Sequence, residues 1–273
     1  MKFSYMVVGN EVKGTNVTGL IGEYETLFKL LSEEGYTGVE ILIKDPFKTD
    51  FKEVERCVKK YNLKLTVICT GEMYGEDGLS FGDNRFEIRK EAIKRTKEAM
   101  KIAEYFGAHV NVGRLRGRFK EGVNQLDTIK WAKEGFLECA LSNKNVNLLL
   151  EPINHKVSNF ILNTKEGIEF IKELNMSNIR LMLDYIHMVI ENEDISESVK
   201  MARDYLDHVH VCDSNRLPLG MGNFDFEEFG KALNEIGYEG YISVEAFEKG
   251  DYRNNIKTAI AMMEKSFKKK DYI

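Results

Sequence analysis

The stretch Leu148-Leu149-Leu150-Glu151-Pro152-Ile153-Asn154 decides the fold of this chain. An apolar run that stops at a glutamate and a proline is typical of a buried strand that brings one carboxylate to the edge of a sheet. Three later runs end in the same way: residues 179–184 (IRLMLD), 208–213 (HVHVCD) and 241–245 (YISVE). The sequence therefore predicts four buried strands with polar side chains at one edge.

Four residues are expected to meet at that edge: Glu151, Asp184, His210 and Glu245. In a strand, residues two apart share a face, so Glu151 should point the same way as Leu149. Three carboxylates that lie this close repel each other unless a cation sits among them. Three hard oxygen ligands and one imidazole suit one divalent metal ion. The alternative, in which each acid separately caps a helix or pairs with a lysine, is disfavoured by four coincident strand ends.

The rest of the chain alternates strand and helix. Further strands are expected over residues 2–8, 38–43, 65–69 and 109–112, and helices over residues 24–34, 51–61, 86–106, 126–141, 196–205 and 254–267, with others that open at residues 164 and 225. Eight such units without a linker fit a single (β/α)8 TIM barrel with a parallel sheet over residues 1–273. The active edge of that barrel is the C-terminal end of its strands.

Two loops should open onto the same edge. The Gly-rich segment 71–84 (GEMYGEDGLSFGDN) is either a functional lid or a mobile excursion. The segment GRLRGR carries Arg114, Arg116 and Arg118. Arginine forks recognise carboxylate and phosphate groups, although such clusters are more often sets of ion pairs. Glu40, in the second strand, either reaches the shared pocket or pairs with an arginine of the barrel.

Charge and composition exclude several classes of protein. Acidic residues outnumber basic residues by 44 to 39, giving a net charge of -5, which argues against a nucleic-acid groove. No window approaches a membrane span, and the apolar run in residues 1–8 is too short for a signal peptide. The four cysteines show no CxxC spacing and are expected as reduced thiols of a cytoplasmic protein. A small-molecule substrate fits these limits.

The residues at the strand ends resemble those of a known family. The four candidate ligands are separated by 33, 26 and 35 residues, and the likeness extends through the local words LLLEPIN, LMLDYIHM, HVHVCDSNR, PLGMGNFDF and ISVEAF. This pattern is similar to ketose 3-epimerases, the D-tagatose/D-psicose 3-epimerase group of the xylose-isomerase-like TIM barrels. The resemblance covers roughly residues 148–247, and the N-terminal half matches only as a barrel. It implies a Mn²⁺-type ion, with Mg²⁺ or Co²⁺ as alternatives, and a homodimer or homotetramer.

The chemistry of such a site follows from its groups. Inverting a carbinol carbon beside a ketone requires removal of a C–H proton, formation of an enediolate and return of a proton to the other face. A divalent cation on the substrate oxygens lowers the cost of the enediolate, typically by several kcal/mol. Carboxylates on either side carry out the proton transfers. We therefore expect C3 epimerisation of a ketose or keto-sugar acid through a metal-bound enediolate, with Glu151 and Glu245 as acid and base, while Asp184 and His210 only hold the ion.

The resemblance also implies two substrate contacts. His187 resembles the family histidine that contacts the oxygen near C2, and Arg216 resembles the arginine that binds a hydroxyl on the reacting face. The alternatives are a helix cap for His187 and an ion pair between Arg216 and Asp213. His208 shares the inward face one layer deeper and is interpreted as a hydrogen-bonded core histidine.

Two departures from the family bear on the substrate. Family members that act on free ketohexoses often carry an acid six residues past the first glutamate, where this chain has Val157, and they lack the GRLRGR arginines. These departures favour an acidic substrate, a keto-sugar acid or a phosphorylated ketose, whose charge Arg114, Arg116 or Arg118 would neutralise.

Other reactions remain open on the same site. Aldose-ketose or hydroxypyruvate-type isomerisation moves the proton between C1 and C2, and an inosose-type dehydratase expels water. A hydrolase like the endonuclease IV relatives needs three zinc ions and many more histidines than the five present. A sugar-binding barrel without catalysis has no need for a second glutamate beside the metal.

Overall fold

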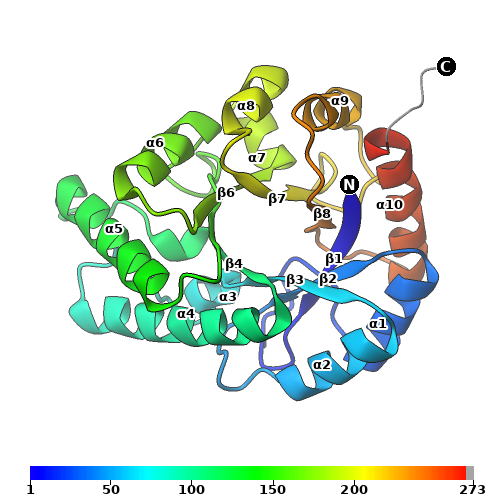
Figure 1. The fold of residues 1–273 in the computed structure, drawn as a ribbon, viewed down its shortest axis with the longest axis horizontal. Helices are drawn as coiled ribbons and strands as arrows, with labels where there is room; N and C mark the ends of the chain where they lie inside the picture. Colours follow the sequence, from blue (N-terminus) through cyan, green and yellow to red (C-terminus); the bar gives the residue numbers. More distant parts are fainter. Residues whose placement is uncertain (269–273) are drawn as a thin grey trace.

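The computed structural model describes residues 1–268, and its strands close into one barrel (Figure 1). Each strand pairs in parallel with its neighbours in sequence, and the last pairs with the first. The strands are β1 (Lys2–Val8), β2 (Gly38–Leu42), β3 (Lys64–Cys69), β4 (His109–Val112), β5 (Leu148–Leu150), β6 (Ile179–Asp184), β7 (Leu206–Val211) and β8 (Tyr241–Val244). The prediction of a (β/α)8 TIM barrel is confirmed.

Helices form a ring around these strands (Figure 1). They are α1 (Tyr24–Glu33), α2 (Phe51–Lys60), α4 (Phe86–Phe106), α5 (Gln125–Ser142), α6 (Thr164–Leu174), α8 (Ile195–Ala202), α9 (Glu227–Glu235) and α10 (Tyr252–Phe267). Within residues 1–268, no helix has both the length and the apolar character needed to cross a membrane. The main apolar core lies between this ring of helices and the outer face of the barrel.

Three short helical segments sit at strand ends and were not predicted: α3 (Gly71–Gly75), the 3₁₀ turn η1 (Arg114–Arg116) and α7 (Tyr185–Ile190). Each begins within two residues of the end of a strand. Segments of three to six residues are too short to show a helical repeat of apolar positions. Sequence periodicity therefore misses them, although all three lie where a barrel carries its function.

The long helix α4 shows why the sequence predicts the outer ring well. Ala92, Ala99 and Ala103 recur at helical spacing and are all buried. Gly107 ends the helix with a φ of 64°, in the left-handed region that favours glycine, and its N–H donates to the carbonyl of Ala103. The helix observed is the one expected, residue for residue.

The inside of the barrel carries a small apolar layer below its mouth. Val67, Leu149 and Met182 form a buried cluster that is separate from the main core. Because strand residues two apart share a face, Leu149 and Met182 direct Glu151 and Asp184 to the same interior, one step nearer the mouth. The alternation of each strand thus sets where its terminal acid points.

Segment 71–84 is only partly the loop that the sequence predicts. Its first residues form α3, and its later part packs inward through Leu79 and Phe81, which are both buried. The ring of Phe81 packs edge to face on Phe136 of α5, with centroids 5.6 Å apart. The segment is therefore tied to the core at its centre.

We expect Phe81→Ala to lower the free energy of unfolding by about 3–5 kcal/mol, because a buried aromatic ring leaves a cavity. Urea denaturation followed by circular dichroism measures this loss. Phe86→Ala is the matched control, since Phe86 is 61% exposed and its loss should change stability by no more than about 0.5 kcal/mol. Equal losses in the two variants would show that Phe81 does not anchor the segment.

Candidate active site

Four neighbouring strands each bring one side chain to the C-terminal mouth of the barrel. Glu151 follows β5, Asp184 ends β6, His210 lies in β7 and Glu245 follows β8. One possible ligand atom from each of the four lies within 4.8 Å of the others. The structure therefore brings together all four residues that the sequence singled out as metal ligands.

His210 stands at the centre of this group. Its Nδ1 atom lies 3.3 Å from Oε2 of Glu245 and 3.9 Å from Oε1 of Glu151. Asp184 is its register partner across β6 and β7. Among the described residues, neither Oδ2 of Asp184 nor Nδ1 of His210 has a hydrogen-bond partner, although both atoms are buried. Unpaired buried ligand atoms beside two carboxylates are what a bound cation would satisfy, so the donor set fits a divalent metal ion.

The two glutamates of the group differ in acidity. Burial raises the pKa of Glu151 to about 7, and the charge of Glu245 adds to that rise. Burial also acts to raise the pKa of Glu245, but the adjacent His210 imidazole and the charge of Arg216 outweigh it and lower that pKa to about 2. The repulsion between the two carboxylates is thus relieved by protonation of Glu151. A cation between them would favour the ionised form of both.

Glu40 lies beneath the site and does not line the cavity. The prediction that Glu40 contacts the substrate is therefore corrected. It is fully buried, with Oε2 2.9 Å from Nε2 of His210 and Oε1 against Nε2 of His208. Leu42, two residues further along β2, lines the cavity instead, which places Glu40 one layer deeper. The carboxylate engages the far nitrogen of His210 and leaves Nδ1 to face the site.

His187 comes from α7 and reaches the cavity. Its Nδ1 lies 2.6 Å from the Nδ2 amide of Asn154, and its Nε2 lies 3.5 Å from Oδ2 of Asp184 and 3.8 Å from Oε1 of Glu151. Burial lowers the pKa of His187 to about 4, so the ring is neutral at pH 7. With Nδ1 accepting from Asn154, the proton resides on Nε2 and points at the cavity.

Arg216 also lines the cavity, held by a backbone with a φ of 58°. Its Nη2 atom lies 3.7 Å from Oε2 of Glu245. The alternative ion pair with Asp213 does not form, because both carboxylate oxygens of Asp213 accept hydrogen bonds from backbone N–H groups of its own loop. Arg216 is therefore directed at the acid cluster.

The three arginines of GRLRGR separate in space. Arg114 lines the cavity, Arg116 is fully buried away from it and Arg118 is exposed and does not line it. The guanidinium of Arg116 donates to the carbonyl oxygens of Phe160, Ile161 and Gly113 at 2.7 to 3.0 Å. The prediction that Arg116 binds substrate is wrong, because its donors are already used to hold the β5–α6 connection.

Two neutral side chains that the sequence reasoning missed hold the glutamates. Asn111 of β4 donates from Nδ2 to Oε2 of Glu151 at 2.9 Å, and Thr18 donates from Oγ1 to Oε1 of Glu245 at 3.0 Å. Asn111 carries a usable signal, since it is a polar residue between two buried valines. Thr18 lies in an irregular loop after β1 and has no pattern that would reveal it.

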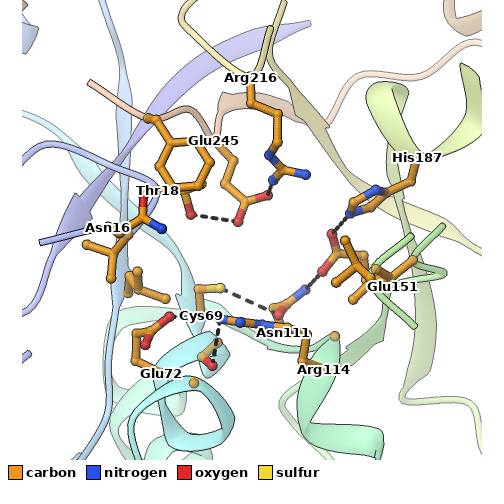
Figure 2. Close-up of a pocket in the computed structure, with 18 residues that line it drawn as sticks. Asn16, Thr18, Cys69, Glu72, Asn111, Arg114, Glu151, His187, Arg216 and Glu245 are labelled. Atoms are coloured by element: carbon orange, nitrogen blue, oxygen red, sulfur yellow. Dashed lines mark hydrogen bonds and ion pairs between the residues drawn. The ribbon is translucent and has the colours of Figure 1, made fainter. Parts of the chain in front are cut away.

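The cavity above these residues has a volume of about 430 Å³, within the range of roughly 300–1,000 Å³ usual for small-molecule sites. Figure 2 shows Glu151 and Glu245 entering it from different sides, with Asn111 beside Glu151. The lining also includes Asn16, Thr18, Glu72, Arg114, Val157, His187, Arg216 and Phe247.

Comparison with known families agrees with this geometry. Residues 28–266 match the xylose isomerase-like TIM barrel family, and the chain belongs to that family.

Its relatives include sugar epimerases. The chain is 30% identical over 217 residues to an L-ribulose 3-epimerase of Methylomonas sp., covering 78% of this chain and 74% of that protein. It is 28% identical over 247 residues to a D-psicose 3-epimerase of Ruminiclostridium cellulolyticum, covering 86% and 83%. A crystal structure of D-allulose 3-epimerase from Methylomonas sp. superimposes with a TM-score of 0.82 at 21% identity, covering 97% of this chain and 98% of that one. The expected likeness to ketose 3-epimerases is confirmed.

We expect Arg116→Met to lower the free energy of unfolding by at least about 2 kcal/mol, because several buried carbonyl groups lose their donor. Urea denaturation measures the loss. Arg118→Met is the matched control, since that side chain is exposed and its change should stay within about 0.5 kcal/mol. If Arg116→Met were as stable as the control and raised only KM, Arg116 would be a substrate residue after all.

Proposed function

We propose that this protein inverts C3 of a ketose, with Glu151 and Glu245 as the two acid/base groups and one divalent metal ion, of the Mn²⁺ type, held beside them. The relatives that epimerise ketoses support the reaction type. The observation that carries the proposal is the placement of the two glutamates on either flank of Asp184 and His210, at the mouth of one cavity.

The order of the strands explains why two glutamates flank the others. β5 and β8 lie on either side of β6 and β7, so Glu151 and Glu245 approach from two directions above Asp184 and His210. A sugar carbon in the cavity would face one carboxylate on each side. Inversion needs this arrangement, because the proton leaves one face and another must arrive at the opposite face.

The reaction can then be written with the side chains in place. One glutamate takes the proton from C3 as the C–H bond breaks, and the electron pair moves into the adjacent ketone. The other glutamate delivers a proton to the opposite face of the same carbon, and the ketone re-forms. Glu151, Asp184, His210 and Glu245 would hold the metal ion, which stabilises negative charge on substrate oxygens when it is bound.

Other side chains position these groups. Asn111 and Thr18 each bind one oxygen of a glutamate, which leaves the second oxygen free to exchange a proton. The Nε2–H of neutral His187 is available to donate to a ketone oxygen in the cavity. Arg216, beside Glu245, acts together with His210 to keep that carboxylate ionised and has donors for a substrate hydroxyl.

The position of hydrogen exchange separates this reaction from its rivals. In D₂O, the protein loaded with Mn²⁺ should place deuterium at C3 of a ketose and form the C3 epimer, as followed by proton NMR. Deuterium at C1 alone would assign an aldose-ketose isomerase, and loss of water would assign a dehydratase.

Glu151→Gln and Glu245→Gln should each lower kcat by about 10²–10⁴, the usual contribution of one acid/base group. Initial rates of C3 epimer formation measure the effect. Glu173→Gln is the control, because Glu173 lies on the outer helix α6 in an exposed ion pair with Lys133 and should leave kcat unchanged. Activity that survives in both site variants would refute the two-glutamate mechanism.

Metal binding can be tested without turnover. After treatment with a chelator, added Mn²⁺ at 100 times its Kd should stabilise the folded protein by about 2.7 kcal/mol and raise Tm by roughly 5–10 °C. Asp184→Asn and His210→Gln should abolish most of this rise. His155→Gln should keep it, since that histidine is exposed and bonds to Glu191 outside the site. A rise that is the same in all four proteins would place the ion elsewhere.

A further inference from the structure

One ion pair in the cavity has no role in the proposed proton transfers. Glu72 of α3 accepts a hydrogen bond at Oε1 from Nη2 of Arg114, at 2.7 Å. Both residues line the cavity, and they lie across it from Arg216 and His187 (Figure 2). The pair therefore stands at the end of the cavity away from the polar groups expected to bind the ketone.

Neighbouring groups hold the Glu72–Arg114 pair in place. The side chain of Glu72 is 9% exposed, whereas that of Arg114 is 37% exposed. Arg114 also donates to the carbonyl of Gly71 at 3.1 Å, and its guanidinium lies 5.8 Å from the ring centre of Tyr74. A Cβ atom at Gly75 would lie 2.3 Å from Oε2 of Glu72, so a larger residue there would require this carboxylate to shift.

The charge of the pair decides what can approach it. Of the three arginines in GRLRGR, only Arg114 lines the cavity, and Glu72 offsets its charge. A phosphate or carboxylate at this end would meet a partly buried carboxylate, and the repulsion between like charges in such a setting weakens binding. An uncharged hydroxyl suits the pair, because it can donate to Glu72 and accept from Arg114.

We propose that the Glu72–Arg114 ion pair is a specificity-determining element that selects ketoses with an uncharged chain end and rejects phosphorylated or carboxylated ones. This inference rests on the proposed epimerase function and replaces the expectation, drawn from the GRLRGR arginines, of an acidic substrate. Oε2 of Glu72 has no hydrogen bond to any residue in 1–268 and is the acceptor for the terminal hydroxyl.

The test compares kcat/KM for free ketopentoses and ketohexoses with that for their terminal phosphates and for a keto-uronate. The wild-type protein should favour the uncharged sugars by at least about tenfold. Glu72→Gln keeps the shape but frees the charge of Arg114, so the ratio of phosphorylated to free ketose should rise at least about tenfold, mainly through KM. Inorganic phosphate should inhibit Glu72→Gln and not the wild-type protein.

A second variant assigns the gain to Arg114. Glu72→Gln combined with Arg114→Met should lose both the preference for phosphorylated ketose and the inhibition by phosphate. Arg118→Met, from the same arginine run but exposed, should behave as wild type. Urea denaturation of each variant establishes that it is folded.

Two results would overturn the inference by different routes. If C3 exchange occurs but the wild-type protein prefers charged ketoses, or Glu72→Gln leaves the ratio unchanged, the ion pair does not select the substrate while the epimerase function stands. If no ketose of either kind exchanges hydrogen at C3, the proposed function itself fails and the selection fails with it.

Discussion

The close approach of three carboxylates, two of them buried and that of Glu245 partly buried, to one imidazole is the constraint on which the rest of this structure depends. Charges of one sign at this distance in a buried site destabilise the fold unless each is balanced. Glu40 supports His210 from below, and Asn111 and Thr18 bind the two glutamates from the sides. The remaining imbalance faces the cavity, where a divalent ion and a polar substrate can compensate it.

The closed barrel allows this arrangement of charges without loss of the fold. Four adjacent parallel strands end at one rim, so their last side chains meet without any long loop having to be ordered. Below them, Val67, Leu149 and Met182 pack in the interior beside the buried Glu40–His208 pair, and the main apolar core lies between the barrel and its helices. The stability of the fold thus comes mainly from apolar packing outside and below the rim, which leaves the rim free to carry charge.

The cavity is polar at two places that serve different ends. Near Glu151 and Glu245, donors and acceptors are arranged around a point where a proton can be exchanged. On the opposite side, Glu72 and Arg114 satisfy each other, so that this wall is polar and has no net charge. The two proposals therefore assign chemistry and selection of the substrate to separate elements, β5 to β8 for the first and the segments after β3 and β4 for the second.

The sequence by itself determined the barrel and the four residues at its rim. Side chains in a strand alternate between its two faces, so the sequence shows which way each strand residue points. Tertiary structure decided the rest. Arg114 and Arg116 would share a face in a strand, but they lie in a 3₁₀ turn, where residues two apart are about 240° apart around the axis, so one faces the cavity and the other is buried. The depth of Glu40 follows from the register between neighbouring strands, which no single strand encodes.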